Sequence, residues 1–380
     1  MKKLFTFLFI ALFGLSGCTL EDDNTGNADY VQDVFIRFEN AGQPNTRADE
    51  GAKGNTDHVT FSSGYIFFIT SQNSIKKCYR IAPAGTTTDL VNNTIALNDF
   101  WTTASTSGYL FQNVSGEVTK VYIIGNIPGS DNITESIIRS KTTLAELKKI
   151  AVPISAQSNV DEVTMDGIDE TLENIDGDNT KKKAEITLTP LSSRIEIAQF
   201  TSAEDVTYKL QGIYISHFYN ELPLNETVDA NKQEVYASNG GADYSVHTYM
   251  CDQATDATAG LGTQNGVVTA PTTAGNVWAY QFLPGADANR ISPRIVIALN
   301  GVTASVGSFD QAQTYYLNIR GFNTASNMDP MKVERGKVYK IANILFKESD
   351  ISDIPNPADI NLTVTVSVAN WDPVTVEPIM

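Results

Sequence analysis

The sequence predicts an all-β protein made of two tandem β-sandwiches with Greek-key connections and a few short helices. Short runs of β-branched and aromatic residues recur along the chain, separated by turn-forming clusters of Asn, Gly, Thr and Ser. Charged residues make up only 19% of the chain, which favours a neutral, polar β-surface over a charge-covered helical one. A length of 380 residues is enough for two domains of ordinary size, each with its own core.

The chain opens with a segment typical of a secretory signal. Two lysines precede an apolar run over residues 4–15, which is too short to span a membrane. Residues 15–18 then read Leu-Ser-Gly-Cys, which resembles the lipobox of bacterial lipoproteins, in which the cysteine becomes the lipidated first residue. We therefore expect residues 1–17 to be a lipoprotein signal peptide and Cys18 to carry the lipid. An ordinary signal peptide with a chance cysteine is the alternative.

One isolated strand is expected in the polar segment that follows. Residues 19–57 are rich in Asp, Asn and Gly, a composition suited to disorder, apart from a short apolar patch at 34–38. In this patch Val34, Ile36 and Phe38 occupy alternate positions and therefore share one face of an extended chain.

The other strands fall into two groups, separated by an acidic stretch at 157–183 that we interpret as a mobile loop. A capping box of sequence Thr-Leu-Ala-Glu predicts one short helix at 143–151 in the first group. The first group of strands is expected at 59–70, 75–81, 108–114 and 117–126. The second is expected at 184–189, 193–200, 206–216, 234–237, 245–251, 277–284, 294–299, 314–321, 337–346 and 360–376.

Little in the sequence points to catalysis or to a bound cofactor. The histidines occur singly, without the spacing of a zinc site, and the chain has no nucleophile elbow, P-loop or dinucleotide-binding glycine motif. Asp166 and Asp169 resemble a glycosidase carboxylate pair in type, but their acidic stretch is better explained as a solvated charge run. We therefore expect no enzyme activity, no metal site and no cofactor.

The charge of the chain limits its partners. The 44 Asp and Glu residues outnumber the 27 Lys and Arg residues, giving a formal net charge of −17. Such a surface repels phosphate backbones and anionic lipid headgroups. We therefore expect no nucleic-acid partner, and expect instead a protein, a glycan or a cell surface.

Four segments taken together resemble the fimbrillin family, the lipoprotein-derived pilins also called type V pilins. They are a strand ending in an Asn-x-Pro turn at 121–128, a strand opening the second domain at 191–197, a penultimate strand at 338–344 and a C-terminal strand pair at 364–371. Each of these four segments could occur by itself in any β-protein. Their order and spacing coincide with the lipobox and the two-domain length over nearly the whole chain.

The resemblance implies an N-terminal strand that is removed during maturation. In the fimbrillin family a trypsin-like protease cuts the surface lipoprotein after an arginine near its N-terminus. Arg47, followed by Ala48, lies in a polar stretch that looks exposed, whereas Arg37 lies inside the isolated strand, where a protease cannot easily bind it. Cleavage there would remove a propeptide, residues 18–47, together with the strand that carries Val34, Ile36 and Phe38.

The resemblance also implies that a strand from another subunit fills the vacated groove. The chain ends with Val374, Val376, Pro378 and Met380 on one face of an extended segment, and these residues are the expected donor. The alternative is that the segment is simply the last edge strand of its own domain, where proline is tolerated. Which terminal strand acts as the donor stays open.

The expected organisation follows from the same resemblance. It implies transthyretin-like sandwiches at 48–190 and 191–380, an outer-membrane lipoprotein precursor and a mature fimbrium at the cell surface. The expected partners are other copies or related pilins, a trypsin-like maturation protease, a host or bacterial surface receptor, and the outer membrane through the lipid before processing. The alternatives are a monomeric, membrane-anchored adhesive or glycan-binding lipoprotein, and a tip or anchor subunit of the same pilus.

Overall fold

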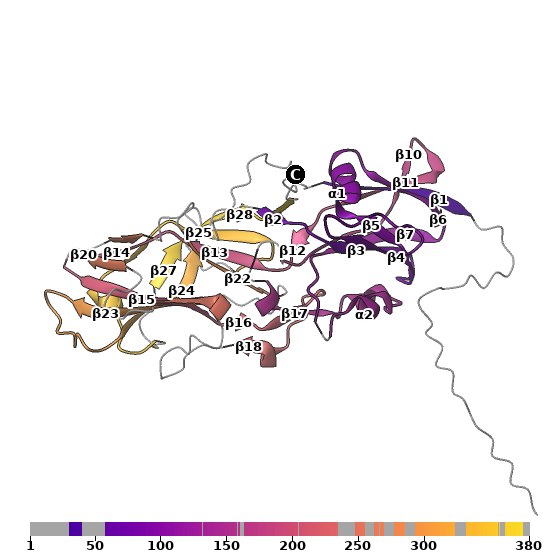
Figure 1. Cartoon of the computed structure of the whole chain (residues 1–380). Helices are drawn as coiled ribbons and strands as arrows, with labels where there is room; N and C mark the ends of the chain where they lie inside the picture. The colour runs from indigo at the N-terminus through magenta and orange to yellow at the C-terminus, as the bar shows by residue number, and fades with distance from the viewer. Residues whose placement is uncertain are drawn as a thin grey trace, which may run out of the picture.

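The computed structural model describes residues 30–39, 58–130, 132–157, 159, 163–203, 205–234, 248–254, 262–265, 267–269, 277–285, 293–323, 332–355, 357 and 362–374. These residues form two β-rich lobes that lie end to end (Figure 1). The all-β class predicted from the sequence is confirmed, since strands dominate and the helices are few and short. Among the described residues, no helix is long and apolar enough to cross a membrane.

Two sheets build the N-terminal lobe, and we name each after one of its strands. The β1 sheet has the order β10 (Glu173–Ile175), β11 (Asp178–Ile186), β1 (Val31–Phe38) and β6 (Tyr109–Ser115). The β3 sheet has the order β12 (Thr189–Pro190), β9 (Met165–Asp169), β7 (Val118–Gly125), β3 (Gly64–Thr70), β4 (Ile75–Ala82) and β5 (Thr94–Ala96).

The β3 sheet is buried on both faces. All seven residues of β3 are buried, and they divide between two hydrophobic clusters according to the alternation of the strand. Ile66 and Phe68 pack in the cluster that also contains the inward side chains of the β1 sheet. Phe67 and Ile69 pack in the other cluster, with Ile138 and other residues of the following helical segment, and this cluster continues into the C-terminal lobe.

Three α-helices lie in the N-terminal lobe. Helix α1 (Leu97–Thr106) was not predicted, although it buries Leu97, Phe100, Trp101 and Ala104 at helical spacing. Helix α2 (Glu135–Arg139) is capped by Thr134. The predicted helix at 143–151 is confirmed in a shorter form as α3 (Leu144–Leu147), in which the Thr143 hydroxyl accepts a hydrogen bond from the Glu146 amide.

The interpretation of residues 157–183 as a mobile loop is wrong over most of its length, because β9, β10 and the first part of β11 lie there. The three consecutive lysines at 181–183 are strand residues, and Lys183 forms ion pairs with Glu173 and Glu185. Lys181 and Lys183 lie on the outer, solvent-facing side of the β1 sheet, and Lys182, opposite Val34, is partly exposed and donates to the Asn174 side chain. The polar composition therefore does not exclude a strand.

The C-terminal lobe is a second sandwich. One layer contains β22 (Trp278–Phe282), β13 (Ser193–Ile197), β25 (Lys337–Ile341) and β28 (Ser367–Asn370), continued by β21 (Val267–Thr269), β14 (Gln199–Ser202) and β26 (Ile344–Phe346). The opposite layer contains β19 (Cys251–Gln253), β15 (Thr207–Ser216), β23 (Arg294–Thr303), β24 (Tyr315–Asn323) and β27 (Leu362–Thr365), with β20 (Gly262–Asn265) also pairing with β15.

Short pairings complete the chain and connect the lobes. Strand β8 (Ala151–Pro153) pairs with β17 (Glu221–Pro223), and β2 (His58–Thr60) pairs with β29 (Asp372–Val374), so both pairs join the two lobes. Strand β16 (Phe218–Tyr219) pairs with β18 (Gln233–Glu234). The 3₁₀ turns are η1 (Ile154–Ala156), η2 (Ala230–Lys232), η3 (Thr248–Met250) and η4 (Glu348–Asp350).

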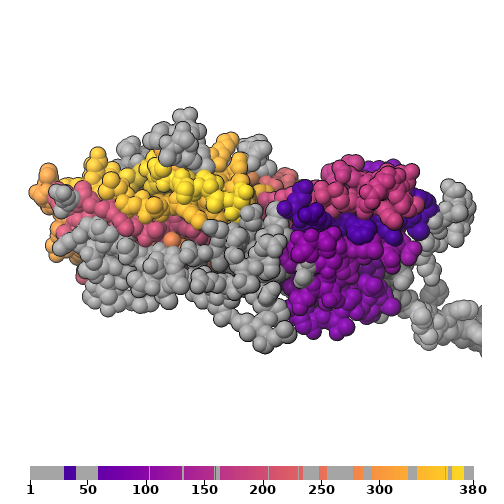
Figure 2. Space-filling view, turned by 90° about the horizontal axis from the view of Figure 1, so that it is seen from above, coloured from indigo at the N-terminus to yellow at the C-terminus, as the bar shows by residue number. Residues whose placement is uncertain are grey.

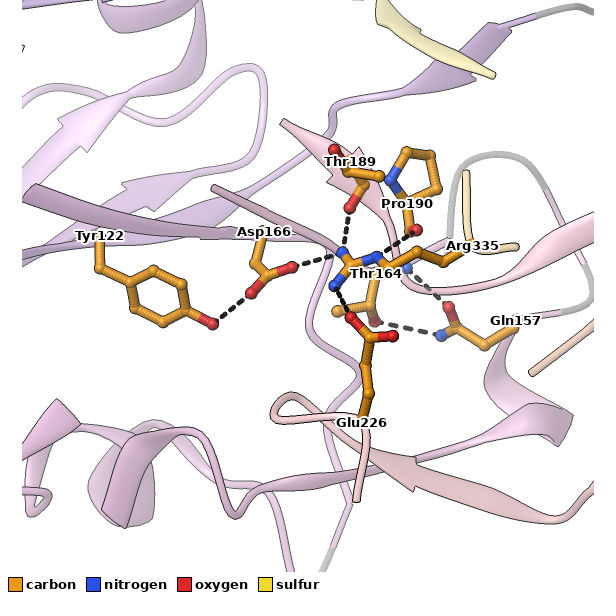
Figure 3. Close-up of polar contacts among 8 residues, drawn as sticks. All are labelled: Tyr122, Gln157, Thr164, Asp166, Thr189, Pro190, Glu226 and Arg335. Carbon is orange, nitrogen blue, oxygen red and sulfur yellow. Dashed lines mark hydrogen bonds and ion pairs between the residues drawn. The ribbon is translucent and has the colours of Figure 1, made fainter. Parts of the chain in front are cut away.

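A polar network centred on Arg335 holds the lobes together (Figure 3). The Arg335 guanidinium donates to the carboxylates of Asp166 and Glu226 and to the main-chain carbonyls of Thr189 and Pro190. Burial alone lowers the pKa of Arg335, but the two carboxylates outweigh it and raise this pKa above its ordinary value. Arg335 therefore stays charged at the junction.

The second carboxylate oxygen of Asp166 extends this network into the β3 sheet. It accepts a hydrogen bond of 2.6 Å from the hydroxyl of Tyr122. Burial, together with the nearby carboxylate, raises the pKa of Tyr122 well above its ordinary value, so the hydroxyl remains a donor. Nearby, Gln157 and Thr164 exchange side-chain and main-chain hydrogen bonds (Figure 3).

Replacing Arg335 with Met should lower the free energy of unfolding by about 3 kcal/mol, because it leaves the buried Asp166 carboxylate without its cation. Urea denaturation of the purified chain measures the loss. Lys337→Met is the matched control, since that exposed lysine bonds only to Asn370, and its effect should stay within about 0.5 kcal/mol. Equal effects of the two substitutions would show that the Arg335 network does not stabilise the junction.

Candidate functional site

The first strand of the chain occupies an interior position in its sheet. Strand β1 lies between β11 and β6, so both of its edges are paired. It is parallel to β11, with Ile36 opposite Ala184, and antiparallel to β6, with Ile36 opposite Tyr109. Figure 2 shows β1, in indigo, on the surface of the N-terminal lobe beside the magenta residues of β10 and β11. Taking β1 away would leave two unpaired strand edges facing one another.

The side chains on alternate positions of β1 form part of the lobe's core. Val34 and Ile36 are fully buried and Phe38 is 3% exposed. The residues between them, Phe35 and Arg37, are partly or fully exposed. The one-faced strand predicted from the alternation is therefore confirmed, and its apolar face points into the core.

Phe38 occupies an aromatic pocket at the end of β1. Its ring centroid lies 4.7 Å from that of Trp101, 5.7 Å from that of Phe100 and 6.2 Å from that of Phe61. Phe61 and Trp101 stack on one another with centroids 4.5 Å apart. We call Phe38, Phe61, Phe100 and Trp101 the aromatic cluster. Edge-on and offset contacts of this kind add stabilisation beyond the area that they bury.

Polar contacts clamp both ends of β1. The buried Gln32 amide donates to the main-chain carbonyls of Val118 and Ser115 in the β6–β7 hairpin. At the other end, the Glu39 amide donates to the Ile186 carbonyl at the end of β11. Hydrogen bonds thus hold each end of β1, and the buried apolar side chains of Val34, Ile36 and Phe38 hold the strand between them.

A bulge sets the register of β1 against β6. The pairing shifts between Gln32 and Val34, so that one residue of β1, Asp33, faces two residues of β6. Asn113 in the bulge has a φ of 56°, a left-handed conformation that asparagine tolerates better than most residues. The Asp33 carboxylate accepts a hydrogen bond from the Asn113 amide, which fixes the bulge in place.

Most other residues proposed from the sequence for maturation lie outside the described part of the chain. These are Cys18, Arg47, Ala48, Val376, Pro378 and Met380. Arg37, the competing arginine, has an exposed side chain, but its main chain is paired with Glu185 of β11. A protease that binds its substrate in an extended form would first have to break this pairing.

The C-terminal segment returns to the N-terminal lobe. Strand β29 ends at Val374, the first residue of the expected donor segment, and runs parallel to β2, with Val374 opposite Thr60. Trp371, just before β29, is 1% exposed and belongs to the same hydrophobic cluster as β1. The expected strand at 360–376 is therefore divided into β27, β28 and β29, which pair with three different partners.

The two carboxylates considered as a pair from the sequence, Asp166 and Asp169, both have structural partners. No group of three or more His, Cys, Asp or Glu residues in the described part of the chain lies close enough together to hold a metal ion. Asp166 is engaged by Arg335 and Tyr122, and Asp169 accepts hydrogen bonds from the amides of Thr171 and Glu185. These two carboxylates hold the main chain and the junction in place.

Sequence reasoning missed α1 and its contribution to the aromatic cluster. Phe100 and Trp101 come from this helix and form two sides of the pocket for Phe38. The spacing of Leu97, Phe100, Trp101 and Ala104 at i, i+3, i+4 and i+7 was the signal that could have found it. The interruption by Thr, Ser and Asn hid this pattern.

Solved structures with the same fold come from Bacteroidetes. A candidate cell adhesion protein of Bacteroides eggerthii aligns with a TM-score of 0.57 at 13% identity, covering 93% of this chain and 100% of its own. A fimbrilin of Porphyromonas gingivalis aligns with a TM-score of 0.56 at 11% identity, covering 92% of this chain and 99% of its own. This chain therefore has a fimbrilin-like fold. No protein-family profile matches the chain, and no curated protein matches it in sequence.

Replacing Val34, Ile36 and Phe38 together with Ser should destabilise the N-terminal lobe by several kcal/mol, since each buried apolar side chain contributes about 1.5 to 3 kcal/mol. Thermal unfolding of the unprocessed chain measures the change. The control replaces Phe35 and Arg37, on the outer face of the same strand, with Ser, and should melt close to the unchanged protein. If the two variants melt at the same temperature, the inward face of β1 does not stabilise the core.

Proposed function

We propose that this chain is a structural subunit of the fimbrillin family, which polymerises into surface fimbriae that serve adhesion. The observation that carries the proposal is the burial of a strand from the first forty residues in the middle of the β1 sheet. The fold shared with the fimbrilin of P. gingivalis supports it. Because these structures share only 11% to 13% sequence identity with the chain, the proposal rests on the position and burial of β1 and not on a match in sequence.

The proposed maturation begins with cleavage after Arg47, which leaves Ala48 as the new N-terminus. Residues 18–47, with Cys18 and its lipid, then separate from the subunit together with β1. Because β1 precedes all other described strands in sequence, a single cut after it separates it covalently from the other strands of the sheet. The edges of β6 and β11 and the pockets of Val34, Ile36 and Phe38 become exposed.

The groove between β6 and β11 that the loss of β1 opens is the site at which one subunit binds the next in the proposed filament. Unpaired strand edges bind an added strand through main-chain hydrogen bonds, while pockets for alternate side chains select its sequence. We assign the donor to the segment of another copy that carries Val374, Val376, Pro378 and Met380. This contact is head to tail and does not close on itself, so repetition produces an open filament.

Domain organisation and location follow from the same proposal. Every strand of the β1 and β3 sheets comes from residues 31–190, and every strand of the second sandwich from residues 193–370, in support of mature domains at 48–190 and 191–380. The precursor is an outer-membrane lipoprotein, and the mature subunit lies in the fimbrium. Its partners are copies of itself or related pilins, the trypsin-like protease and a surface receptor.

The Arg47→Ala substitution should leave a lipidated chain that is about 30 residues longer than the mature subunit and does not polymerise, because it removes the basic residue after which a trypsin-like protease cuts. N-terminal sequencing and electron microscopy of protein sheared from cells carrying the variant measure both effects. Wild-type fimbriae should begin at Ala48.

Arg37→Ala is the control for this substitution and should be processed and assembled normally. Finding Ala48 at the N-terminus of the Arg47→Ala protein, or never finding it in wild type, contradicts the maturation step. Surface protein that keeps residues 18–47 in wild type would instead favour a monomeric lipoprotein or an anchor subunit.

Cysteines at Val376 and Lys182 should crosslink neighbouring subunits, since Lys182 of β11 lies opposite Val34, whose place Val376 takes in the proposed joint. In a Cys78→Ser, Cys251→Ser background, mild oxidation of surface fimbriae should give a covalent ladder on a denaturing gel. Pairing Val376→Cys with Leu345→Cys, an exposed position in β26, should give no ladder. Crosslinks within single subunits only, or normal filaments after deletion of residues 372–380, would reject the C-terminal donor.

A further inference from the structure

The contact that holds the C-terminal segment on the N-terminal lobe is small. Among the described residues, β2 and β29 pair with each other alone, in parallel, over three residue positions. One of these positions is Pro373, which has no amide hydrogen to donate. Parallel pairing is slightly weaker per residue than antiparallel pairing. Strand β2 itself is also held by Asn126, whose side chain donates to the Thr60 carbonyl and accepts from the Ser62 amide. The hold on β29 therefore depends largely on side-chain packing.

That packing comes from the hydrophobic cluster beneath β1. Val59 of β2, Phe61 directly after it and Trp371 directly before β29 are at most 1% exposed, and all three belong to the cluster that contains Phe38. Phe61 stacks on Trp101, and Phe38 lies against both rings. The segment that pairs with β29 is thus tied, through Phe61, to the last residue of β1.

Trp371 also has one buried polar group without a hydrogen-bond partner among the described residues. Its main-chain amide donates to the Gly336 carbonyl at 3.0 Å, and the Arg194 guanidinium lies 6.0 Å from its ring. The indole N–H groups of Trp371 and Trp101, however, are buried with no hydrogen-bond partner among the described residues. A buried unpaired donor costs free energy, so the segment stays in place only while the apolar contacts around it are intact.

We propose that Phe38 is a positioning residue that couples the first strand to the C-terminal segment. While Phe38 fills the aromatic cluster, Phe61 and β2 are held in place and β29 remains docked. When Phe38 leaves with β1, the cluster loses one of its four rings, the apolar packing around Val59, Phe61 and Trp371 weakens, and the segment beginning at Asp372 is released. In the proposed assembly, on which this inference rests, one cleavage would open the acceptor groove and free the donor of the same subunit.

The coupling can be measured in the unprocessed chain by hydrogen exchange. Phe38→Ala should speed exchange of the amides at 366–374 by about tenfold, because it removes a ring from the apolar packing that includes Phe61 and Trp371, while β7 stays protected. Val34→Ala is the matched control. It also removes a fully buried side chain from β1, but from the middle of the strand and outside the aromatic cluster, and should change exchange at 366–374 by less than about twofold.

Phe38→Leu serves if the alanine variant does not fold, since it keeps an apolar side chain and removes only the ring contacts. Equal exchange at 366–374 in the Phe38 and Val34 variants, or no change in either Phe38 variant, overturns the coupling. The assay uses unpolymerised precursor, so its result is separate from the proposed function. Filaments that form without this coupling would overturn the coupling alone, whereas coupling in a chain that never polymerises would overturn only the assembly.

Discussion

The position of β1 between β6 and β11 is the constraint on which the rest of the structure depends. The strand comes from the start of the chain but pairs with segments about 75 and 150 residues later. Interior strands normally cannot be removed, because the chain continues from both of their ends into the fold. Here β1 precedes every other strand and helix of the described residues in sequence, so a single cut between residues 39 and 58 would separate it from them.

The hydrophobic cluster beneath β1 contains residues from both ends of the described chain, Phe38 and Trp371. Phe38 closes one end of the sandwich by filling a space lined by α1 and by the residue after β2. Trp371, which directly precedes β29, packs in the same hydrophobic cluster but is not one of the four rings of the aromatic cluster. Between the lobes, Arg335 and the β8–β17 pair hold the junction independently of β1. Loss of β1 would therefore leave these contacts between the lobes in place.

Local patterns in the sequence predicted part of this site. The alternation of Val34, Ile36 and Phe38 predicted a one-faced strand, and all three side chains are buried. The pairing partners of each strand could not be predicted from the sequence. Pairing depends on contacts between distant segments, and the local alternation of side chains carries no information about them. The acidic composition of 157–183 led to a loop prediction, since composition does not distinguish a solvated loop from a strand with one face in water. The role of Asp166 depends on Arg335, 169 positions away, and could not be predicted either.

The most direct test of a replaceable first strand is a cryo-electron microscopy map of fimbriae taken from the cell surface. The density between β6 and β11 should belong to residues 374–380 of a neighbouring subunit, with side chains of Val376, Pro378 and Met380 in the pockets that Val34, Ile36 and Phe38 occupy in the precursor. Density continuous with the same subunit and matching residues 31–38 would show that β1 is never exchanged, and would contradict assembly by strand replacement.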